Sequence, residues 1–548
     1  MTKKLEDYTQ DELIEVVKNL RRRKKFGLVW EDKPEEVVGL CQTNLPVLEE
    51  VAERAIIDEQ NSRTNIFIEG DNYHSLSALN YTHAGKVDVI YIDPPYNTGS
   101  NDFIYNDKYV DREDTFRHSK WLSFMSKRLR LAKQLLSDEG IIYISIDDNE
   151  HSNLKMLCDE IFDEAKFLGT ITWEKRTKSQ NTKTAREMLQ LKTEYVLAYK
   201  NVNERVAFAL EESGEKKYEL EDNKGLYRLK KVEEMSAKGM RGRKTMIYPI
   251  MDVLPRDGYQ WKVGKATISD FLKREDIQLV EGKPYQKIRP SDESSKTFTP
   301  FWSHFLGKDA YGTAETGKSE LKKIFDGDDK NFETVKPVKL IKKLLFHVNK
   351  REDVTVLDFF AGSGTTAQAV RELNEEDGGS RKFILCTNNE NNIADEIAYP
   401  RIKKVIEGYS GKEGLPTNVR YFKTSLVSKK QTDDQTRVEL VARSTDMICI
   451  REDTFGEIAN EGSYKVFKGN KGYSAIAFEP DAIEPLKSRL QGIKDKLPIS
   501  IYVFSLSNDS YESDFADLKN KHQLRPIPES ILEVYKRIFT QTNKEVAK

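Results

Sequence analysis

The sequence predicts an α/β protein built on a largely parallel sheet. Three short apolar runs read as buried strands, at residues 65–69, 87–92 and 354–358. Each run is followed by a turn that carries glycine, proline or a carboxylate, and then by a segment whose apolar residues have helical spacing. This alternation is typical of an open parallel sheet, which binds its ligands at the carboxyl ends of its strands.

Length and composition limit the class of protein. The chain has 548 residues, which corresponds to roughly three or four domains. Its 88 Lys and Arg residues nearly cancel its 90 Asp and Glu residues, so a nucleic-acid partner would need a local basic surface. The four cysteines stand singly, so we expect neither a disulfide framework nor a metal site. Without a transmembrane-length apolar run or a signal-peptide pattern, we expect a cytoplasmic protein with no membrane contact.

Residues 1–60 are predicted to form a polar helical region. Apolar residues between positions 13 and 20 fall on one helical face, and the basic run Arg21–Lys25 follows them. That run is either a solvated helix face or a contact for phosphates, and the sequence favours neither.

The first strand, at 65–69, ends in Gly70-Asp71-Asn72. A carboxylate at a strand terminus suits a hydroxyl or an amine of a bound nucleoside. The side chain of Asp71 would also cap the helix that follows, so both roles stay open at this point.

The second strand, at 87–92, runs into Asp93-Pro94-Pro95-Tyr96. The two prolines fix φ and remove backbone donors, which leaves a stiff turn lined with acceptors. The carboxylate of Asp93 and the carbonyl of Pro94 together can accept both protons of an exocyclic amino group. Tyr96 offers a flat face for a base extruded from a helix. The plain alternative is a proline turn with a capping Asp, and we favour the functional interpretation.

This tetrapeptide resembles the catalytic motif of amino-methyltransferases, which methylate N6 of adenine or N4 of cytosine in DNA. The longer run Tyr91–Gly99 is similar to the modification (Mod) subunits of type III restriction–modification systems, as are residues 26–31, 421–423 and 451–455. The resemblance implies a DNA methyltransferase that uses S-adenosylmethionine. Its catalytic residues would be Asp93, Pro94, Pro95 and Tyr96.

The elements after this turn continue the sheet. Residues 100–115 are predicted to form a mobile loop near the substrate, and 116–136 a helix. A turn at Asp138–Gly140 precedes a strand at 141–146, and the acidic run Asp147–Glu150 is expected to cap the next helix. Two further strands, at 171–173 and 195–199, would close the sheet.

Between about 174 and 330 the strand–helix alternation is lost. Basic residues are interleaved with aromatic ones, which suits phosphate contact and base stacking. A plain surface density of lysines on a small β-rich domain explains the composition equally well. The position of the segment matches the target-recognition domain of the family. The basic residues in question are Lys175, Arg176, Lys178, Lys183, Arg186, Arg228, Lys230, Lys231, Lys238, Arg241, Arg243 and Lys244.

A second regular region begins near Pro337 and contains the strand 354–358, followed by Phe359–Thr366 and a helix. Glycines in such a turn let a ligand approach the backbone and the free N–H groups of the helix start. The turn lacks the third glycine of a dinucleotide fingerprint and the Lys of a P-loop. It resembles the S-adenosylmethionine loop of methyltransferases.

The resemblance implies a cofactor site formed by Asp71, Asp93, Lys336, Asp358, Phe360, Gly362, Gly364, Thr366 and Glu390. In many relatives a carboxylate directly at the end of the next strand holds the cofactor ribose. Here Thr387–Asn389 stand between the strand at 383–386 and Glu390, so the residue that fills this role is left open.

The catalytic turn therefore precedes the cofactor loop. This order resembles the β group of amino-methyltransferases, a circular permutation of a Rossmann-like sheet. We predict five regions: an N-terminal helical region (1–60), a catalytic half (61–200), a target-recognition domain (201–330, with DNA contacts from about 174), a cofactor-binding half (331–414) and a C-terminal α/β module (415–548). The last region serves either partner binding and dimerisation or simple structural support.

The functional hypothesis is site-specific methylation of adenine N6 in double-stranded DNA, with the target base flipped out of the helix. The alternatives are N4-cytosine methylation, RNA methylation, and a DNA-binding specificity subunit without methyl transfer. Adenine is preferred because cytosine members of the family more often carry Ser at the place of Asp93. The expected partner is double-stranded DNA, and the resemblance implies a homodimer. No helicase or nuclease motif is present, so we expect no cleavage by this chain alone, and the sequence leaves open whether a restriction (Res) subunit accompanies it.

Overall fold

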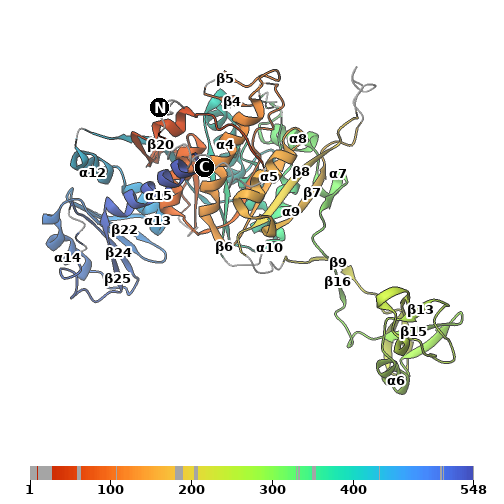
Figure 1. Cartoon of the computed structure of the whole chain (residues 1–548). Helices are drawn as coiled ribbons and strands as arrows, with labels where there is room; N and C mark the ends of the chain where they lie inside the picture. Colours follow the sequence, from red (N-terminus) through yellow and green to blue (C-terminus); the bar gives the residue numbers. More distant parts are fainter. Residues whose placement is uncertain are drawn as a thin grey trace. The chain divides into compact units, whose positions relative to one another are not determined.

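The computed structural model describes residues 9, 28–58, 63–100, 102–106, 108–178, 189–202, 208–328, 330, 332, 334–348, 353–430, 432–506, 509 and 511–546. The chain divides into two compact units (Figure 1). The first contains Met1–Ala207 and Trp302–Lys548, and the second contains Phe208–Phe301. The helical run predicted before residue 21, the basic run Arg21–Lys25, and Lys183 and Arg186 lie outside the described residues.

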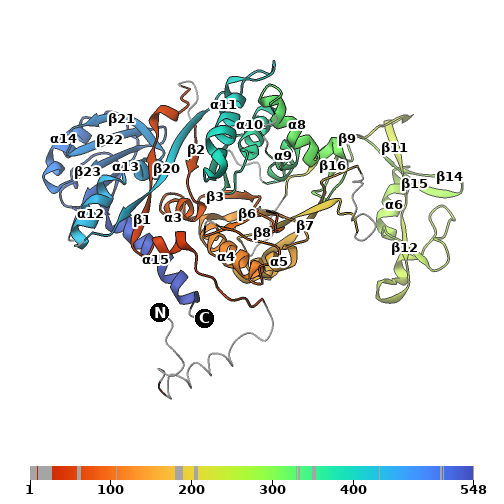
Figure 2. The ribbon, with the colours of Figure 1, turned by 90° about the horizontal axis from the view of Figure 1, so that it is seen from above.

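The first unit is organised on a ten-stranded sheet with the order β1-β20-β2-β19-β18-β3-β6-β8-β7-β17 (Figure 2). From β20 to β6 all neighbours are parallel, whereas β8 is antiparallel to both β6 and β7. The strands are β1 Asn44–Glu50, β2 Thr64–Glu69, β3 Val87–Ile92, β6 Leu136–Ile146, β7 Phe167–Glu174, β8 Thr193–Lys200, β17 His304–Phe305, β18 Val354–Asp358, β19 Arg381–Thr387 and β20 Asn418–Ser428. The predicted fold class, an α/β fold on a largely parallel Rossmann-like sheet, is confirmed.

Helices cover both faces of this sheet (Figure 2). On one face lie α3 Asn72–Thr82, α4 Arg117–Leu135 and α5 His151–Phe162, and on the other α8 Ala314–Ile324, α9 Val338–Phe346, α10 Thr365–Asp377 and α11 Tyr399–Glu407. The helical spacing of the apolar residues explains how these helices pack on the sheet. In α4, for example, Trp121, Met125 and Leu129 repeat every four residues and are fully buried. Shorter elements are α2 Glu36–Leu40, α7 Lys308–Tyr311, and the hairpin β4 Ile104–Tyr105 with β5 Lys108–Tyr109.

The pairing of β18 with β3 shows how the catalytic half and the cofactor-binding half of the sequence form one sheet. β18, from the second half of the chain, lies between β19 and β3, with Val356 opposite Val89 and Leu357 opposite Ile90. Because the two strands are parallel, Asp93 and the turn after Asp358 emerge at the same edge of the sheet. Two segments far apart in sequence thus meet where such sheets bind ligands.

Two predicted elements and two predicted domain boundaries are wrong. Residues 44–50 form the edge strand β1 rather than helix, and Pro46 fits there because an edge strand can spare a backbone donor. Asp138–Gly140 belongs to β6, whose pairing with β3 shifts register between Val87 and Val89 and so absorbs these residues. The segment 302–330 belongs to the first unit instead of the inserted one, and β20 extends the main sheet beyond residue 414.

The second unit has a small core of its own. Its strands are β9 Glu211–Glu215, β10 Leu220–Asp222, β11 Gly225–Lys231, β12 Glu234–Ser236, β13 Tyr259–Trp261, β14 Ile277–Val280, β15 Lys283–Ile288 and β16 Lys296–Thr299, with the helix α6 Lys265–Lys273 among them. Trp261 and Tyr248 are buried at its centre, joined by a 2.8 Å hydrogen bond from the indole N–H to the backbone carbonyl of Tyr248. A turn at Glu281–Gly282 connects β14 to β15.

The C-terminal module is a five-stranded sheet in the order β21-β22-β23-β24-β25. Its elements are α12 Asp433–Ala442, α13 Thr445–Glu452, β21 Thr454–Asn460, β22 Tyr464–Gly469, β23 Tyr473–Ala477, α14 Ile483–Gln491, β24 Ile499–Phe504, β25 His522–Ile527 and α15 Glu529–Val546. Both α13 and α15 contact α3. Part of the module's buried residues join those of the main sheet in one cluster, and the others form a cluster of their own. Among the described residues, no helix has the length and hydropathy needed to cross a membrane.

Candidate active site

The turn after β3 presents a carbonyl acceptor beside a carboxylate. The indole N–H of Trp121, itself fully buried, donates to the carbonyl of Pro95 at 2.7 Å and so fixes the turn. The carbonyl of Pro94 accepts no hydrogen bond within the described part of the chain. Asp93 and Pro94 therefore offer the pair of acceptors that the sequence predicts for an amino group.

Four polar side chains form a network with Asp93. The Lys336 ammonium lies 2.8 Å from Oδ1 and 2.9 Å from Oδ2 of Asp93 and donates to the hydroxyl of Tyr96 at 2.8 Å. The Tyr96 hydroxyl lies 2.8 Å from Asp93 Oδ1 and 3.2 Å from Glu194 Oε2. Lys175 contacts the other oxygen of Glu194 at 2.9 Å. Two carboxylates and two ammonium groups thus form one balanced network around the turn.

Burial strengthens this network. Lys336 and Glu194 are about one-tenth exposed. Burial alone would lower the pKa of Lys336, but Asp93 and Glu194 outweigh it and raise that pKa above its ordinary value. Burial opposes ionisation of Glu194 as well, yet Lys336 and Lys175 hold its pKa below the usual range. For Tyr96, burial and the two nearby carboxylates raise the pKa of the phenol far above its ordinary value. Lys336 and Glu194 are therefore charged, and Tyr96 neutral, at neutral pH.

Glu150 fixes the end of the catalytic turn. This carboxylate is buried and accepts from the side chains of Asn97 (2.6 Å), His118 (2.6 Å) and Asn153 (2.7 Å). Asn97 follows Tyr96 with a left-handed φ of 57°, which its side-chain bonds stabilise. The prediction that the acidic run caps α5 is wrong for Glu150, whose side chain makes no cap bond.

The Gly-rich turn follows β18 at the same sheet edge. Asp358 is buried and accepts from the backbone N–H of Phe360 at 3.0 Å and from the hydroxyl of Thr366 at 2.6 Å. Burial, together with the charge of Asp93, raises the pKa of Asp358 to about 7 despite those two bonds. Gly362 and Gly364 both have positive φ, 51° and 76°, so the turn requires glycine at these positions.

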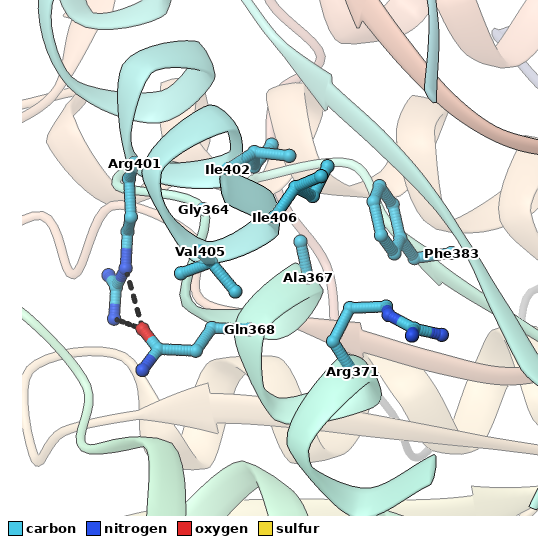
Figure 3. A pocket seen from close by; sticks show the side chains of 9 residues that line it. All are labelled: Gly364, Ala367, Gln368, Arg371, Phe383, Arg401, Ile402, Val405 and Ile406. Carbon is cyan, nitrogen blue, oxygen red and sulfur yellow. Dashed lines mark hydrogen bonds between the residues drawn. The ribbon is translucent and has the colours of Figure 1, made fainter. Parts of the chain in front are cut away.

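A buried arginine supports this turn. Arg401 of α11 donates to the hydroxyl of Thr365 at 2.7 Å, to the hydroxyl of Ser363 at 3.0 Å and to the amide oxygen of Gln368 at 2.9 Å. Figure 3 shows Arg401 and Gln368 pointing toward one another beside the small cavity that Gly364 borders. Burial lowers the pKa of Arg401 to about 10, so it stays charged at neutral pH. The remaining lining is largely apolar, which marks this cavity as a packing gap between α10, β19 and α11.

Asp71 has the capping role that the sequence left open. Its carboxylate accepts from the N–H of Tyr73 at 2.7 Å and lies 3.5 Å from the buried Arg128. Its neighbour Asn72 donates to the carbonyl of Phe359 at 3.3 Å and accepts from Arg128. These contacts connect the end of β2 to the Gly-rich turn. Glu390 is exposed on the short turn Glu390–Asn392 after β19, and its role at a ribose stays a prediction.

The residues at this edge suit S-adenosylmethionine chemically. A Cβ built on Gly362 would meet the carbonyl oxygen of Phe360 at 3.8 Å and the ring of Phe332 at 3.9 Å, which are ordinary van der Waals distances, so the backbone at this glycine is not crowded by its neighbours. The carboxylates of Asp71 and Asp358 and the ammonium of Lys336 come from this sheet edge and match the opposite charges of a zwitterionic amino-acid tail. The assignment of each residue to an atom of the cofactor stays a prediction.

Sequence reasoning missed Glu194, Lys175, Glu150, Arg128 and Arg401 as members of the site. Glu194 carried a weak signal, since it is a carboxylate in the strand Thr193–Lys200, which is otherwise largely apolar. Arg128 and Arg401 stand at the spacing of the buried faces of their helices, since Arg128 lies three residues after Met125 and Arg401 lies four residues before Val405. Their charge hid this signal, because charged residues are seldom buried.

Comparison with known proteins gives consistent results. Residues 87–399 match a family of N6/N4 methyltransferases described as DNA methylase. The chain is 33% identical over 405 residues to the Mod subunit of the type III restriction-modification enzyme StyLTI of Salmonella typhimurium; the match covers 66% of this chain and 58% of that relative, less than two thirds of its length. It is 32% identical to the EcoPI Mod subunit of Escherichia phage P1, with 70% of this chain and 67% of that one covered. It is also 33% identical to the type II methyltransferase M.KpnI of Klebsiella pneumoniae, with 62% and 84% covered.

Proposed function

The chain belongs to the N6/N4 DNA methylase family and has type III Mod subunits among its relatives, and on that basis we propose that it methylates adenine N6 in double-stranded DNA. In this proposal it is the modification and DNA-recognition subunit of a type III restriction–modification system, acts in the cytoplasm, and takes its methyl group from S-adenosylmethionine. One observation carries it. The Pro94 carbonyl, which accepts no hydrogen bond from a described residue, stands beside Asp93 at the edge where the Gly-rich turn after β18 also emerges.

The residues of the turn define how an amino group would be held. Asp93 and the Pro94 carbonyl each accept one N–H of the target amino group. Those bonds keep the nitrogen lone pair from delocalising into the ring and direct it away from the two oxygens. Tyr96 orients Asp93 through its hydroxyl, 2.8 Å away. Its ring is the predicted stacking surface for the flipped base.

S-adenosylmethionine, when bound, supplies an electrophilic methyl group on sulfur. The residues that would hold it are Asp71, Asp93, Asp358, Phe360, Gly362, Gly364, Thr366, Lys336 and Glu390. Transfer needs no covalent bond to the chain, so the contribution of these residues is positioning and fixed charge. The cysteines agree with this scheme, because all four are buried and burial raises the pKa of each thiol.

The inserted unit is the proposed target-recognition domain. Many of its cations are neutralised: Arg228 and Lys216 pair with Glu293, Lys287 and Arg289 with Asp222, and Arg256 with Glu234. Residues 236–246 differ, because they carry four cations and no acid. Here Lys238, Arg243 and Lys244 are exposed and form no ion pair with a described residue.

This segment, residues 236–246, which we call the basic loop, is the part of the inserted unit best suited to phosphates. When an unpaired Lys or Arg neutralises a phosphate, a counterion is released from the DNA, which favours binding. A cation that already forms an ion pair in the protein must first lose that partner. Met240 at its centre is fully exposed, and an apolar side chain among cations suits contact with a groove. We propose that the basic loop makes the principal phosphate contacts of this unit.

The experiment uses the purified full-length chain and PCR-amplified bacterial genomic DNA, which carries no modified bases. After incubation with S-adenosylmethionine, single-molecule sequencing should find N6-methyladenine at one recurring sequence. N4-methylcytosine at that sequence would support the alternative base. Cofactor binding without any modified base would support a specificity subunit, and transfer to RNA alone would support the RNA alternative.

The quaternary partners are part of the same proposal. A homodimer and a complex with a Res subunit are what resemblance to type III Mod subunits implies. Light scattering of the purified chain tests the first, and co-purification from the native operon tests the second.

A further inference from the structure

The ammonium of Lys336 is shared between two carboxylates in the active site. It lies 2.8 and 2.9 Å from the oxygens of Asp93 and 3.3 Å from Oε2 of Glu194. The two acids come from different strands, since Asp93 follows β3 and Glu194 lies in β8. Lys336 itself precedes α9. Three segments of the sheet edge therefore meet at one cation.

This arrangement leaves Asp93 occupied. Both of its oxygens face Lys336, and the hydroxyl of Tyr96 is a third partner at 2.8 Å. A carboxylate held by an ammonium is a weaker acceptor for a neutral amino group, because the cation already neutralises its charge. Three of the roughly four acceptor positions of the carboxylate are thus taken, and for Asp93 to accept from a target amino group with its full charge, Lys336 has to withdraw at least partly.

Glu194 offers the ammonium another partner close by. The distance from Lys336 to Glu194 is already 3.3 Å, so a small movement of the lysine side chain closes it. Lys175 holds the opposite oxygen of Glu194 at 2.9 Å, which keeps that carboxylate in place. Without Glu194, a Lys336 that left Asp93 would be a buried cation without a partner, which is strongly unfavourable.

We propose that Glu194 is a positioning residue that accepts Lys336 when the target amino group binds to Asp93. The inference rests on the proposed function and adds to it a coupled exchange: Lys336 pairs mainly with Asp93 in the free protein and moves to Glu194 in the complex. No bond is made or broken in this step apart from hydrogen bonds and ion pairs.

The test compares four proteins on a duplex that contains the sequence found by genomic methylation: wild type, Glu194→Gln, Lys336→Met and the double variant. All rates are single-turnover rates at saturating cofactor, and calorimetry gives the cofactor dissociation constant of each protein. Glu194→Gln keeps the shape of the side chain but removes its charge, so it should slow transfer about ten- to a hundredfold, the usual effect of removing a charged hydrogen bond. Cofactor affinity should stay within about threefold, because Glu194 contacts no residue of the Gly-rich turn and the substitution leaves the ammonium of Lys336, its one contact among the proposed cofactor residues, in place.

The double variant separates this proposal from a structural role. If Glu194 acts by drawing Lys336 from Asp93, removing the ammonium makes Glu194 unnecessary, and the double variant should be about tenfold faster than Glu194→Gln. If Glu194 had only a structural role, the losses in transfer rate caused by the two substitutions would add, and the double variant would be slower than Glu194→Gln. Glu174→Gln is the matched control and should transfer at the wild-type rate, because this carboxylate on the neighbouring strand β7 accepts from the N–H of Gly307 and not from Lys336.

A second measurement avoids variants altogether. In a structure of the wild-type chain with the target duplex, Lys336 should lie within hydrogen-bond distance of Glu194 and no longer contact both oxygens of Asp93. A Lys336 that stays on both oxygens overturns the proposal, as does a double variant slower than Glu194→Gln. A wild-type chain that transfers no methyl group to any DNA overturns the proposed function and this inference together.

Discussion

Asn97 and Glu150 are joined by a 2.6 Å hydrogen bond between side chains that are both buried and 53 residues apart in sequence. The bond connects the residue after Tyr96 to the residue before α5, and it holds Asn97 in a left-handed conformation. The position of the catalytic turn is thus set from two directions, by Trp121 at Pro95 and by Glu150 at Asn97.

Removal of this acceptor should loosen the turn. Glu150→Ala leaves the side chains of Asn97, His118 and Asn153 without their shared partner, which should cost about 1–3 kcal/mol of unfolding free energy. Chemical denaturation measures that change, and the methyl-transfer rate should fall at least about tenfold because the turn is misplaced. Glu160→Gln, on the same helix but more exposed, is the control. Wild-type rates in Glu150→Ala would show that the turn needs no such support.

Asp93 should be essential for transfer, whereas cofactor binding should be largely kept without it, because Asp93 is one of several residues proposed to hold S-adenosylmethionine. Asp93→Ala removes one of the two acceptors for the amino group, and we expect transfer of tritiated methyl groups to DNA to fall by at least about a hundredfold. Calorimetry should still detect S-adenosylmethionine binding, since the Gly-rich turn is intact. Undiminished transfer by this variant would refute the assignment of Asp93.

Stability should depend on pH through Asp358. Burial, together with the charge of Asp93, raises the folded-state pKa of this acid to about 7, above its ordinary value near 4. A raised pKa means that the folded protein holds the proton more tightly than the unfolded chain does. The contribution to stability is complete below about pH 4 and disappears as the pH rises through about 7. Relative to Asp358→Asn, the wild type should become less stable by up to about 4 kcal/mol between these limits. Melting curves of both proteins at pH 5, 6, 7 and 8 measure this change. A stability difference between the two proteins that stays the same at every pH would contradict the prediction.

The basic loop should account for much of the salt dependence of DNA binding. Replacing Lys238, Arg243 and Lys244 together by Ala should weaken binding at low salt and reduce the slope of log K against log salt by about one unit for each phosphate that is no longer neutralised. The control is the triple change Lys262→Ala, Lys273→Ala and Lys296→Ala, which removes the same charge from cations that already lie beside acids. Equal slopes in both triple variants would place the DNA-binding surface elsewhere on this unit.

The strand–turn–helix units were predictable because each combines an apolar run with a distinctive turn. The strands at β2, β3 and β18 and the helices after them follow the expected positions closely. The edge strand β1 was not predictable, because Pro46 and two glutamates hide its buried face. Within the site, the structure brings Lys336 into contact with Asp93 and Tyr96, whereas the sequence analysis named Lys336 only as a cofactor residue. Glu150, Glu194 and Arg401 were missed because their importance comes from burial, and burial depends on which elements pack against each other.

The insertion of β18 between β19 and β3 has a consequence for synthesis on the ribosome. Lys336 and Asp93 are 243 residues apart in sequence. During synthesis β3 can pair with β6 on one side, but its other neighbour, β18, is translated much later. The first half of the chain therefore emerges with an exposed, unpaired strand edge, and no complete site exists until the second half has been translated. A ribosome that stops inside the inserted unit would release a fragment prone to aggregate and unable to modify anything.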